Sequence, residues 1–228
     1  MTRLRIDDDV DRRTLTVVIT ALACLWGAHY GVEWAPDGFT RLAEMNWWAG
    51  TQIAFYLVVP MVVMATIGVR PHEYGWKVRG TASHWRVYAA ILTVALPFVF
   101  VASFSTEFQE RYPLYEIARG QSGVWGDLAS WWPLYVIQFV AIESFFRGFL
   151  VLGLGRRIGA NAVLVATIPY LMIHLVKPPA EAAASIVGGL VMGTLAWRTK
   201  SIWWGVVVHV GVAMAMDVSS LGHKGFLW

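Results

Sequence analysis

Residues 131–153 read WWPLYVIQFVAIESFFRGFLVLG, and this stretch decides the class of fold. The run is apolar over a length that can cross the hydrocarbon core of a bilayer, which takes about 20 helical residues. It also contains Glu143 and Arg147, which are four residues apart and therefore share one face of a helix. The stretch predicts a transmembrane helix with an ion pair near its middle.

Apolar runs of similar length recur along the chain. Hydrophobic residues make up 57% of the 228 residues and charged residues only 14%, which is too apolar for a soluble domain of this size. Spans are predicted at 15–34, 47–69, 85–104, 131–153, 160–176, 181–197 and 201–218. We therefore predict an all-α polytopic transmembrane helix bundle with about seven to eight spans. Tryptophans near the ends of the runs are typical of aromatic belts in the headgroup layer, so no nucleic-acid partner is expected.

The fifth and sixth of these spans are short and are separated by the tripeptide KPP at 177–179. We expect both to pack inside the bundle rather than to face lipid. Ser185, Gly189 and Gly193 form a stripe of small residues along the sixth span, which predicts a close approach to a neighbouring helix.

Lys and Arg are concentrated before the first span and after the second, fourth and sixth spans. This bias predicts a multi-pass protein of the cell inner membrane with a cytoplasmic N-terminus. The predicted divisions are a cytoplasmic tail at 1–14, transmembrane helices and an outer loop at 15–130, a helical core at 131–218 and a C-terminal tail at 219–228. The polar stretch 105–130 is expected to be an outer loop with a surface helix, or a partly re-entrant segment.

Charged groups inside a span are costly. Each costs on the order of 2.5–3.5 kcal/mol near the centre of a span, and such residues usually mark a functional site. Glu143 and Arg147 could instead be an ion pair that only fixes helix packing. Two imidazoles, His174 near the end of the fifth span and His209 in the seventh, favour the functional interpretation because bundle interiors are where such groups converge.

The set Glu143, His174 and His209 suits two kinds of chemistry. A carboxylate and an imidazole can activate a water that attacks an amide carbonyl, while a second imidazole stabilises the oxyanion. Alternatively, the same three residues are a set of ligands for a catalytic zinc ion. The residues alone favour neither.

The order of these residues resembles that of a known family. Glu143-x-x-x-Arg147-Gly is followed by Tyr170-x-x-x-His174, by a glycine-rich helix and by His209. This pattern, over about 131–218, is similar to the CAAX protease and bacteriocin-processing (CPBP or Abi) family of intramembrane metalloproteases. The resemblance implies an enzyme that hydrolyses a membrane-associated protein or peptide. Glu143 would be the general base assisted by His174, His209 would stabilise the oxyanion, and Arg147 would hold Glu143.

The sequence departs from the family pattern at two positions. The first Glu of the family's Glu-Glu-x-x-x-Arg motif is Ile142 here, and Ala213 stands where the family has Asn or a similar residue after the third-motif His. Tyr170 stands at the position of the family's Phe. The chain is thus a variant with a single Glu in the first motif.

Glu181, Lys177 and Asp217 are further candidates for a supporting role. Glu181 begins the sixth span after Lys177 and could point back toward His174, or could simply favour the start of the helix. Asp217, about two turns after His209, could orient that imidazole or could be an interfacial carboxylate.

Two other functions fit the same residues. A catalytically inactive family member acting as an immunity or binding scaffold would explain Ile142 and Ala213. A small transporter could use Glu143 as a proton relay, although the sequence has no evident inverted repeat of the kind common in transporters.

Overall fold

The computed structural model describes residues 11–118 and 120–227, and all regular secondary structure in these ranges is helical. Six helices are long and apolar enough to cross a membrane: Arg12–Trp34, Arg41–Thr66, Thr81–Ala102, Val124–Ile158, Pro179–Thr199 and Trp203–His223. The prediction of an all-α polytopic bundle is confirmed. Most of the predicted tail at 1–14 lies outside the described residues.

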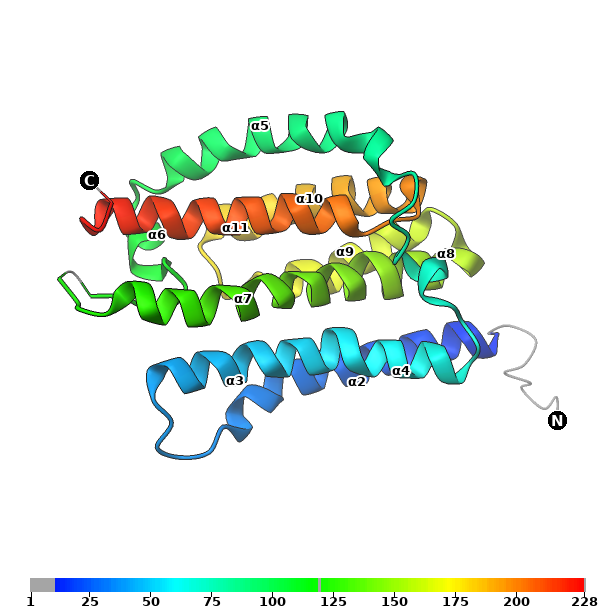
Figure 1. Cartoon of the computed structure of the whole chain (residues 1–228). Helices are drawn as coiled ribbons and strands as arrows, with labels where there is room; N and C mark the ends of the chain where they lie inside the picture. The colour runs from blue at the N-terminus through cyan, green and yellow to red at the C-terminus, as the bar shows by residue number, and fades with distance from the viewer. Residues whose placement is uncertain (1–10, 119, 228) are drawn as a thin grey trace.

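The chain forms the helices labelled in Figure 1. They are α2 (Arg12–Tyr30), α3 (Arg41–Ile53), α4 (Val59–Thr66), α5 (Trp85–Ala102), α6 (Thr106–Arg111), α7 (Val124–Glu143), α8 (Gly153–Ile158), α9 (Asn161–Met172), α10 (Pro179–Thr199) and α11 (Trp203–His223). Two π-helical segments make longer rods, because Ala54–Val58 joins α3 to α4 and Ser144–Leu152 joins α7 to α8. Short 3-10 helices lie at Gly31–Trp34, Pro71–Tyr74 and Thr81–His84.

Local sequence signals set several helix ends. The Asp11 carboxylate accepts a hydrogen bond from the Thr14 amide at 2.9 Å and caps α2. Thr40 caps α3 in the same way, through the amide of Ala43. Pro179 occupies the first turn of α10, where its missing N–H costs nothing.

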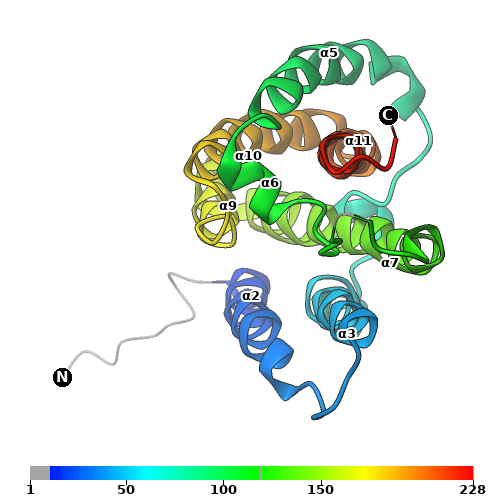
Figure 2. The ribbon, with the colours of Figure 1, turned by 90° about the vertical axis from the view of Figure 1, so that its left-hand side faces the viewer.

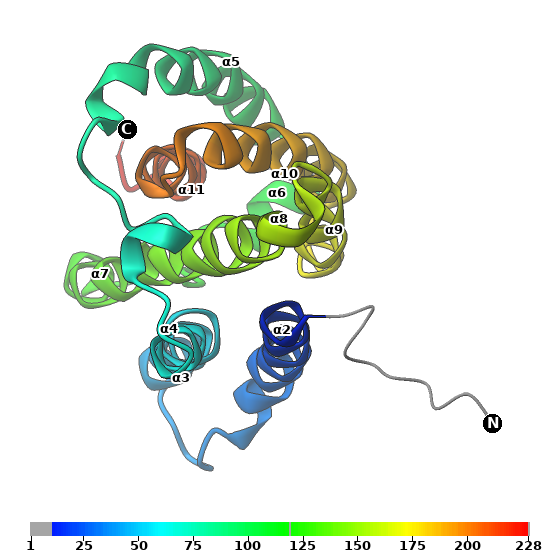
Figure 3. The same cartoon turned by 90° about the vertical axis from the view of Figure 1, so that its right-hand side faces the viewer.

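The long helices run between two ends of the bundle, with α7 at the centre (Figures 1–3). We call the end where α2 begins, at Arg12, the proximal end, and the end where α11 finishes, at His223, the distal end. The pair α2 and α3 lies on one side of α7, and α11 followed by α5 lies on the other. The most apolar part of Val124–Ile158 is 78% buried, against 11% for Thr81–Ala102, so the helix that carries the charged residues is the most enclosed.

The expectation that the fifth and sixth spans pack inside the bundle is wrong. The predicted span 160–176 is the short helix α9, and Leu164 and Ile168 on it are exposed, as is Val187 on α10. The physical reason is that α9 and α10 use one face to pack against each other and against the π-helical segment, which leaves their opposite faces exposed.

The predicted close approach of α10 is confirmed. A Cβ added at Gly189 would lie 2.8 Å from a Thr167 side-chain atom, and one at Gly193 would lie 2.9 Å from Val163. Small residues on α10 therefore allow α9 to pack directly on its backbone.

The stretch 105–130 differs from the expected outer loop. The surface helix exists as α6, but Tyr112, Leu114 and Ile117 are buried, and α7 begins at Val124 rather than at 131. We call the segment 112–118 the distal strap. It can be buried because distant side chains satisfy its backbone: Asp217 accepts from the Leu114 amide at 3.1 Å.

The last helix supplies two further bonds to the distal strap. Ser220 donates to the carbonyl of Tyr112, and Lys224 donates to that of Ile117 at 3.0 Å. Helix α11 accordingly continues to His223, beyond the predicted end at 218.

At the proximal end, the Pro71–Tyr74 turn packs against the π-helical segment. A Cβ added at Gly148 would lie too close to the carbonyl oxygen of Tyr74. Arg156 pairs with Glu73 of the same turn. Gly148 thus fixes how closely the proximal loop approaches the central helix.

We predict that Gly148→Ala destabilises the protein by about 1–3 kcal/mol, since the added methyl group overlaps a backbone oxygen and forces a shift. Thermal unfolding in detergent measures the effect. Gly188→Ala is the matched control, because no atom lies within 4 Å of a Cβ at this α10 position. An equal loss of stability in both variants would contradict the role assigned to Gly148.

Candidate functional site

Glu143 and Arg147 form an ion pair in the most enclosed part of the bundle. The Arg147 Nη1 atom lies 3.3 Å from Glu143 Oε1, and the two side chains are 3% and 1% exposed. Glu143 is the last residue of α7, and Arg147 lies in the π-helical segment that follows. Such π-helical insertions are frequent at functional sites. The predicted pairing of these two residues is confirmed.

His209 of α11, the helix beside α7, is the third member of this group. Its Nδ1 atom lies 3.0 Å from Glu143 Oε1, and its ring packs 4.6 Å from that of Phe139. The His209 side chain is 17% exposed, whereas Glu143 is 1% exposed. The imidazole is therefore the member of the pair that a water molecule can reach more easily.

Helix α9 contributes Tyr170, and the turn that follows contributes His174. The Tyr170 ring lies 4.1 Å from the Arg147 guanidinium carbon, in cation–π contact. The same ring is 4.5 Å from the His174 ring and 6.3 Å from the His209 ring. His174 donates from Nδ1 to the Tyr170 carbonyl at 2.7 Å. Tyr170 thus connects the two imidazoles predicted from the sequence.

The second oxygen of Glu143 is packed against α11. A Cβ added at Gly205 would lie 2.5 Å from Glu143 Oε2, and this oxygen has no hydrogen-bond partner among the described residues. Sequence reasoning missed Gly205. The available signal was its spacing, since it lies one helical turn before His209 and therefore on the same face.

Glu181 and Lys177 belong to a second polar group. Tyr112 donates to Glu181 Oε2 at 2.6 Å, and Lys177 lies 3.7 Å from Glu181 Oε1. The Lys177 ammonium also donates to the Tyr112 hydroxyl at 3.3 Å. Burial lowers the pKa of Lys177, and the Glu181 carboxylate opposes this shift. Both oxygens of Glu181 thus face Lys177 and the distal strap.

Asp217 has a structural function rather than one at an interface. It is fully buried, and its oxygens accept from the Leu114 amide and from the Trp132 indole at 3.2 Å. The expectation of an interfacial carboxylate is therefore wrong, because these two donors replace water around the charge.

The side chains at the two positions that depart from the family pattern pack in the hydrophobic core. Ile142 and Ala213 are 6% and 5% exposed, and both belong to the main hydrophobic core. Neither position offers a polar atom to the site.

The donor set does not fit the zinc site considered from the sequence. Catalytic zinc takes three protein ligands. Glu143 accepts a hydrogen bond from Nδ1 of His209, so the carboxylate and the lone pair of Nε2 lie on opposite sides of this ring. No group of three or more His, Cys, Asp or Glu residues within 11–118 and 120–227 is arranged to hold a metal ion. We therefore assign no step to a metal.

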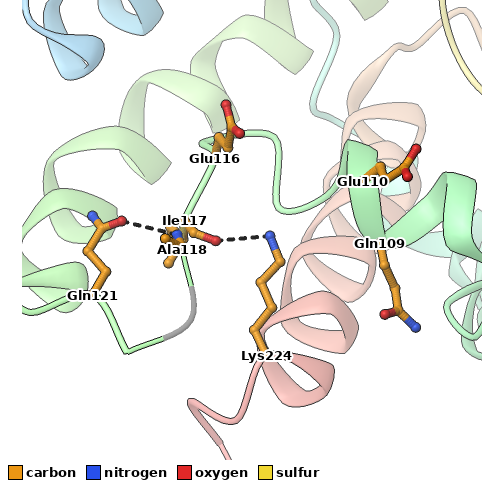
Figure 4. Close-up of a pocket in the computed structure, with 7 residues that line it drawn as sticks. All are labelled: Gln109, Glu110, Glu116, Ile117, Ala118, Gln121 and Lys224. Carbon is orange, nitrogen blue, oxygen red and sulfur yellow. Dashed lines mark hydrogen bonds between the residues drawn. The ribbon is translucent and has the colours of Figure 1, made fainter.

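A pocket of about 490 Å³ opens at the distal end, apart from this site (Figure 4). Its lining is mostly polar: Gln109, Glu110, Glu116, Ile117, Ala118, Gln121 and Lys224. Lys224 donates to the Ile117 carbonyl, and the Gln121 side chain accepts from the Ala118 amide at 3.2 Å. Lys224 and Gln121 are thus engaged in holding the distal strap.

The region that builds the site matches a known family model. Residues 124–215 match the model described as type II CAAX prenyl endopeptidase Rce1-like. Over these residues the chain is similar to Rce1-like domains. The matched segment contains Glu143, Arg147, Tyr170, His174 and His209, so the family resemblance predicted from the motifs is confirmed over these residues. Searches of curated proteins and of solved structures found no match.

We predict that Gly205→Ala displaces the Glu143 carboxylate and lengthens its contact with His209. The imidazole chemical shifts of His209 in detergent-solubilised protein report this contact directly. Gly50→Ala on α3 is the control, because a Cβ there meets nothing within 4 Å. Unchanged His209 signals in Gly205→Ala would show that the carboxylate does not depend on this glycine.

Removing one partner of the ion pair leaves an uncompensated buried charge. We expect Arg147→Met to lower the free energy of unfolding by about 3–5 kcal/mol. The double variant Glu143→Gln/Arg147→Met should recover most of this loss, because neither charge then remains. Arg41→Met is the control, since Arg41 pairs with Glu116 where both side chains are at least half exposed. If the double variant is no more stable than Arg147→Met, the effect is not one of charge.

Proposed function

We propose that this protein is an intramembrane endopeptidase of the CAAX-protease type that hydrolyses a membrane-associated protein or peptide. The observation that carries the proposal is the contact between Glu143 and His209, a buried carboxylate–imidazole pair within the segment that matches the Rce1-like model. The proposed setting is the cell inner membrane, with the proximal end and the N-terminus on the cytoplasmic side.

The pairing fixes the tautomer of His209. An ionised carboxylate can only accept hydrogen bonds, so Nδ1 of His209 carries the hydrogen and Nε2 carries a lone pair. Arg147 keeps Glu143 ionised by placing a positive charge 3.3 Å from the same oxygen. The imidazole is thus oriented as a base that can take a proton from water.

This geometry favours a different division of roles from the one expected from the sequence. Glu143 is enclosed by His209, Arg147 and Gly205. We therefore propose that Glu143 orients His209 and stabilises its protonated form, rather than binding the water itself. His209, with the larger exposed fraction, is the proposed general base. The imidazolium that forms on His209 then protonates the departing amine.

His174 is the proposed second imidazole of the site. Its Nδ1 hydrogen is held by the Tyr170 carbonyl, which leaves Nε2 as an acceptor. Nε2 of His174 can accept a hydrogen bond from the attacking water, through the hydrogen that the water does not transfer to His209.

The test uses purified protein in liposomes with membrane-anchored, fluorescence-quenched reporter peptides, and mass spectrometry to identify the new termini. We expect wild type to cleave and both His209→Ala and Glu143→Gln to lose about 10²–10⁴-fold in kcat. Ser144→Ala is the matched control, because this buried neighbour of Glu143 carries a hydroxyl with no hydrogen-bond partner among the described residues.

Wild-type turnover in His209→Ala would remove the imidazole from the mechanism. Loss of cleavage on chelation, together with a stoichiometric bound metal, would overturn the assignment of water activation to His209 alone. If wild type cleaves no reporter, and His209→Ala and Glu143→Gln keep full function in cells, the scaffold hypothesis replaces the enzyme.

A further inference from the structure

We propose that Phe139 is a positioning residue, which sets the orientation of the His209 imidazole and thereby the direction of its Nε2 lone pair. The inference rests on the proposed function and deepens it, because it concerns what orients the proposed general base. The ring centroids of Phe139 and His209 lie 4.6 Å apart, and the two planes are inclined by 44°. Phe139 thus contacts the imidazole directly.

Helix α7 brings two side chains to the same imidazole. Phe139 and Glu143 are four residues apart in the last turns of α7, which ends at Glu143, so they share one face of this helix. That face packs against α11, which carries His209. The imidazole therefore meets a carboxylate through a hydrogen bond and an aromatic ring through packing, both from α7.

The hydrogen bond alone does not fix the orientation of the imidazole. It joins Nδ1 to Glu143 Oε1 at 3.0 Å, and the ring can still turn about the axis through this bond. The χ2 angle of histidine has only broad preferences, so the rotamer does not choose one orientation. Because Nε2 lies off that axis, such a turn redirects the lone pair that accepts the proton of the water. A second contact is needed to stop the turn.

Phe139 can provide this contact because its own ring is held in place. Its side chain is 6% exposed and lies 4.7 Å from the ring of Tyr135, which stacks on Trp131 at 5.2 Å. Tyr135 and Trp131 are 3% and 0% exposed. In an interior packed this closely, a turn of the imidazole toward Phe139 meets a ring that has no space to retreat into. A side chain locked by packing is what a precisely oriented site requires.

The test compares Phe139→Leu with wild type. We expect kcat for the reporter that wild type cleaves to fall by about 10–100-fold, since a misplacement of about 1 Å can cost about 10²-fold, with KM within about twofold. Phe139→Met fills more of the space with a flexible side chain and should lose kcat in the same way. Phe149→Leu is the matched control, since Phe149 is equally buried and stacks on Phe145.

A spectroscopic measurement separates positioning from general packing. The imidazole nitrogen chemical shifts of His209 report its tautomer, which in wild type carries the hydrogen on Nδ1 alone. In Phe139→Leu and Phe139→Met the ring is free to turn away from Glu143, so we expect the tautomer protonated on Nε2 to appear beside the first. Phe149→Leu should keep the wild-type shifts.

The outcomes decide as follows. A loss of kcat in Phe139→Leu and Phe139→Met, together with a mixture of tautomers, supports the proposal. Wild-type kcat in either variant, or a loss of kcat with the Nδ1 tautomer intact, overturns it. Equal effects in Phe149→Leu reduce Phe139 to a packing residue and also overturn it. If wild type cleaves no reporter, the proposed function fails, while the tautomer of His209 still shows whether Phe139 orients this imidazole.

Discussion

The rest of the structure depends on keeping one ion pair away from lipid. A carboxylate and a guanidinium in the same span cannot face hydrocarbon without a large desolvation cost, so the helix that carries Glu143 and Arg147 must be surrounded. Helix α7 and the π-helical segment are accordingly the most enclosed part of the bundle, with α3 on one side and α11 on the other. Within the described residues, the ion pairs of the other long helices lie at helix starts, as Arg41–Glu44 does in α3 and Lys177–Glu181 does at α10, so the middle of these helices can have exposed apolar faces.

The residues of the site can be predicted from the sequence because the desolvation cost falls on individual polar side chains within apolar runs. Glu143, Arg147 and His209 stand out as polar residues inside apolar runs, and the structure brings all three together. Which imidazole touches the carboxylate is a different matter. This contact depends on how α11 is rotated about its axis and on Gly205, which lets α11 approach Glu143. Composition and spacing do not determine that rotation.

The distal strap shows why the rest of the fold was harder to predict. A polar stretch such as 105–130 normally lies on the surface, since its backbone needs hydrogen-bond partners. Here the partners are side chains of α11 and of Lys224 directly after it, about a hundred positions further along the chain. Helix ends were misplaced for the same reason, because hydropathy ends where polar residues begin, whereas α7 and α11 continue through polar residues that are bonded elsewhere.

The bond between Asp217 and the Leu114 amide also orders the events of biosynthesis. The chain is made from its N-terminus, so Leu114 and Trp132 leave the ribosome well before Asp217 does. The amide of Leu114 therefore lacks its native acceptor until residue 217 has been made. A nascent chain arrested before residue 217 would keep the contacts of Tyr112 with Glu181 and of Tyr115 with Asp127, but not the bond that α11 makes to the distal strap.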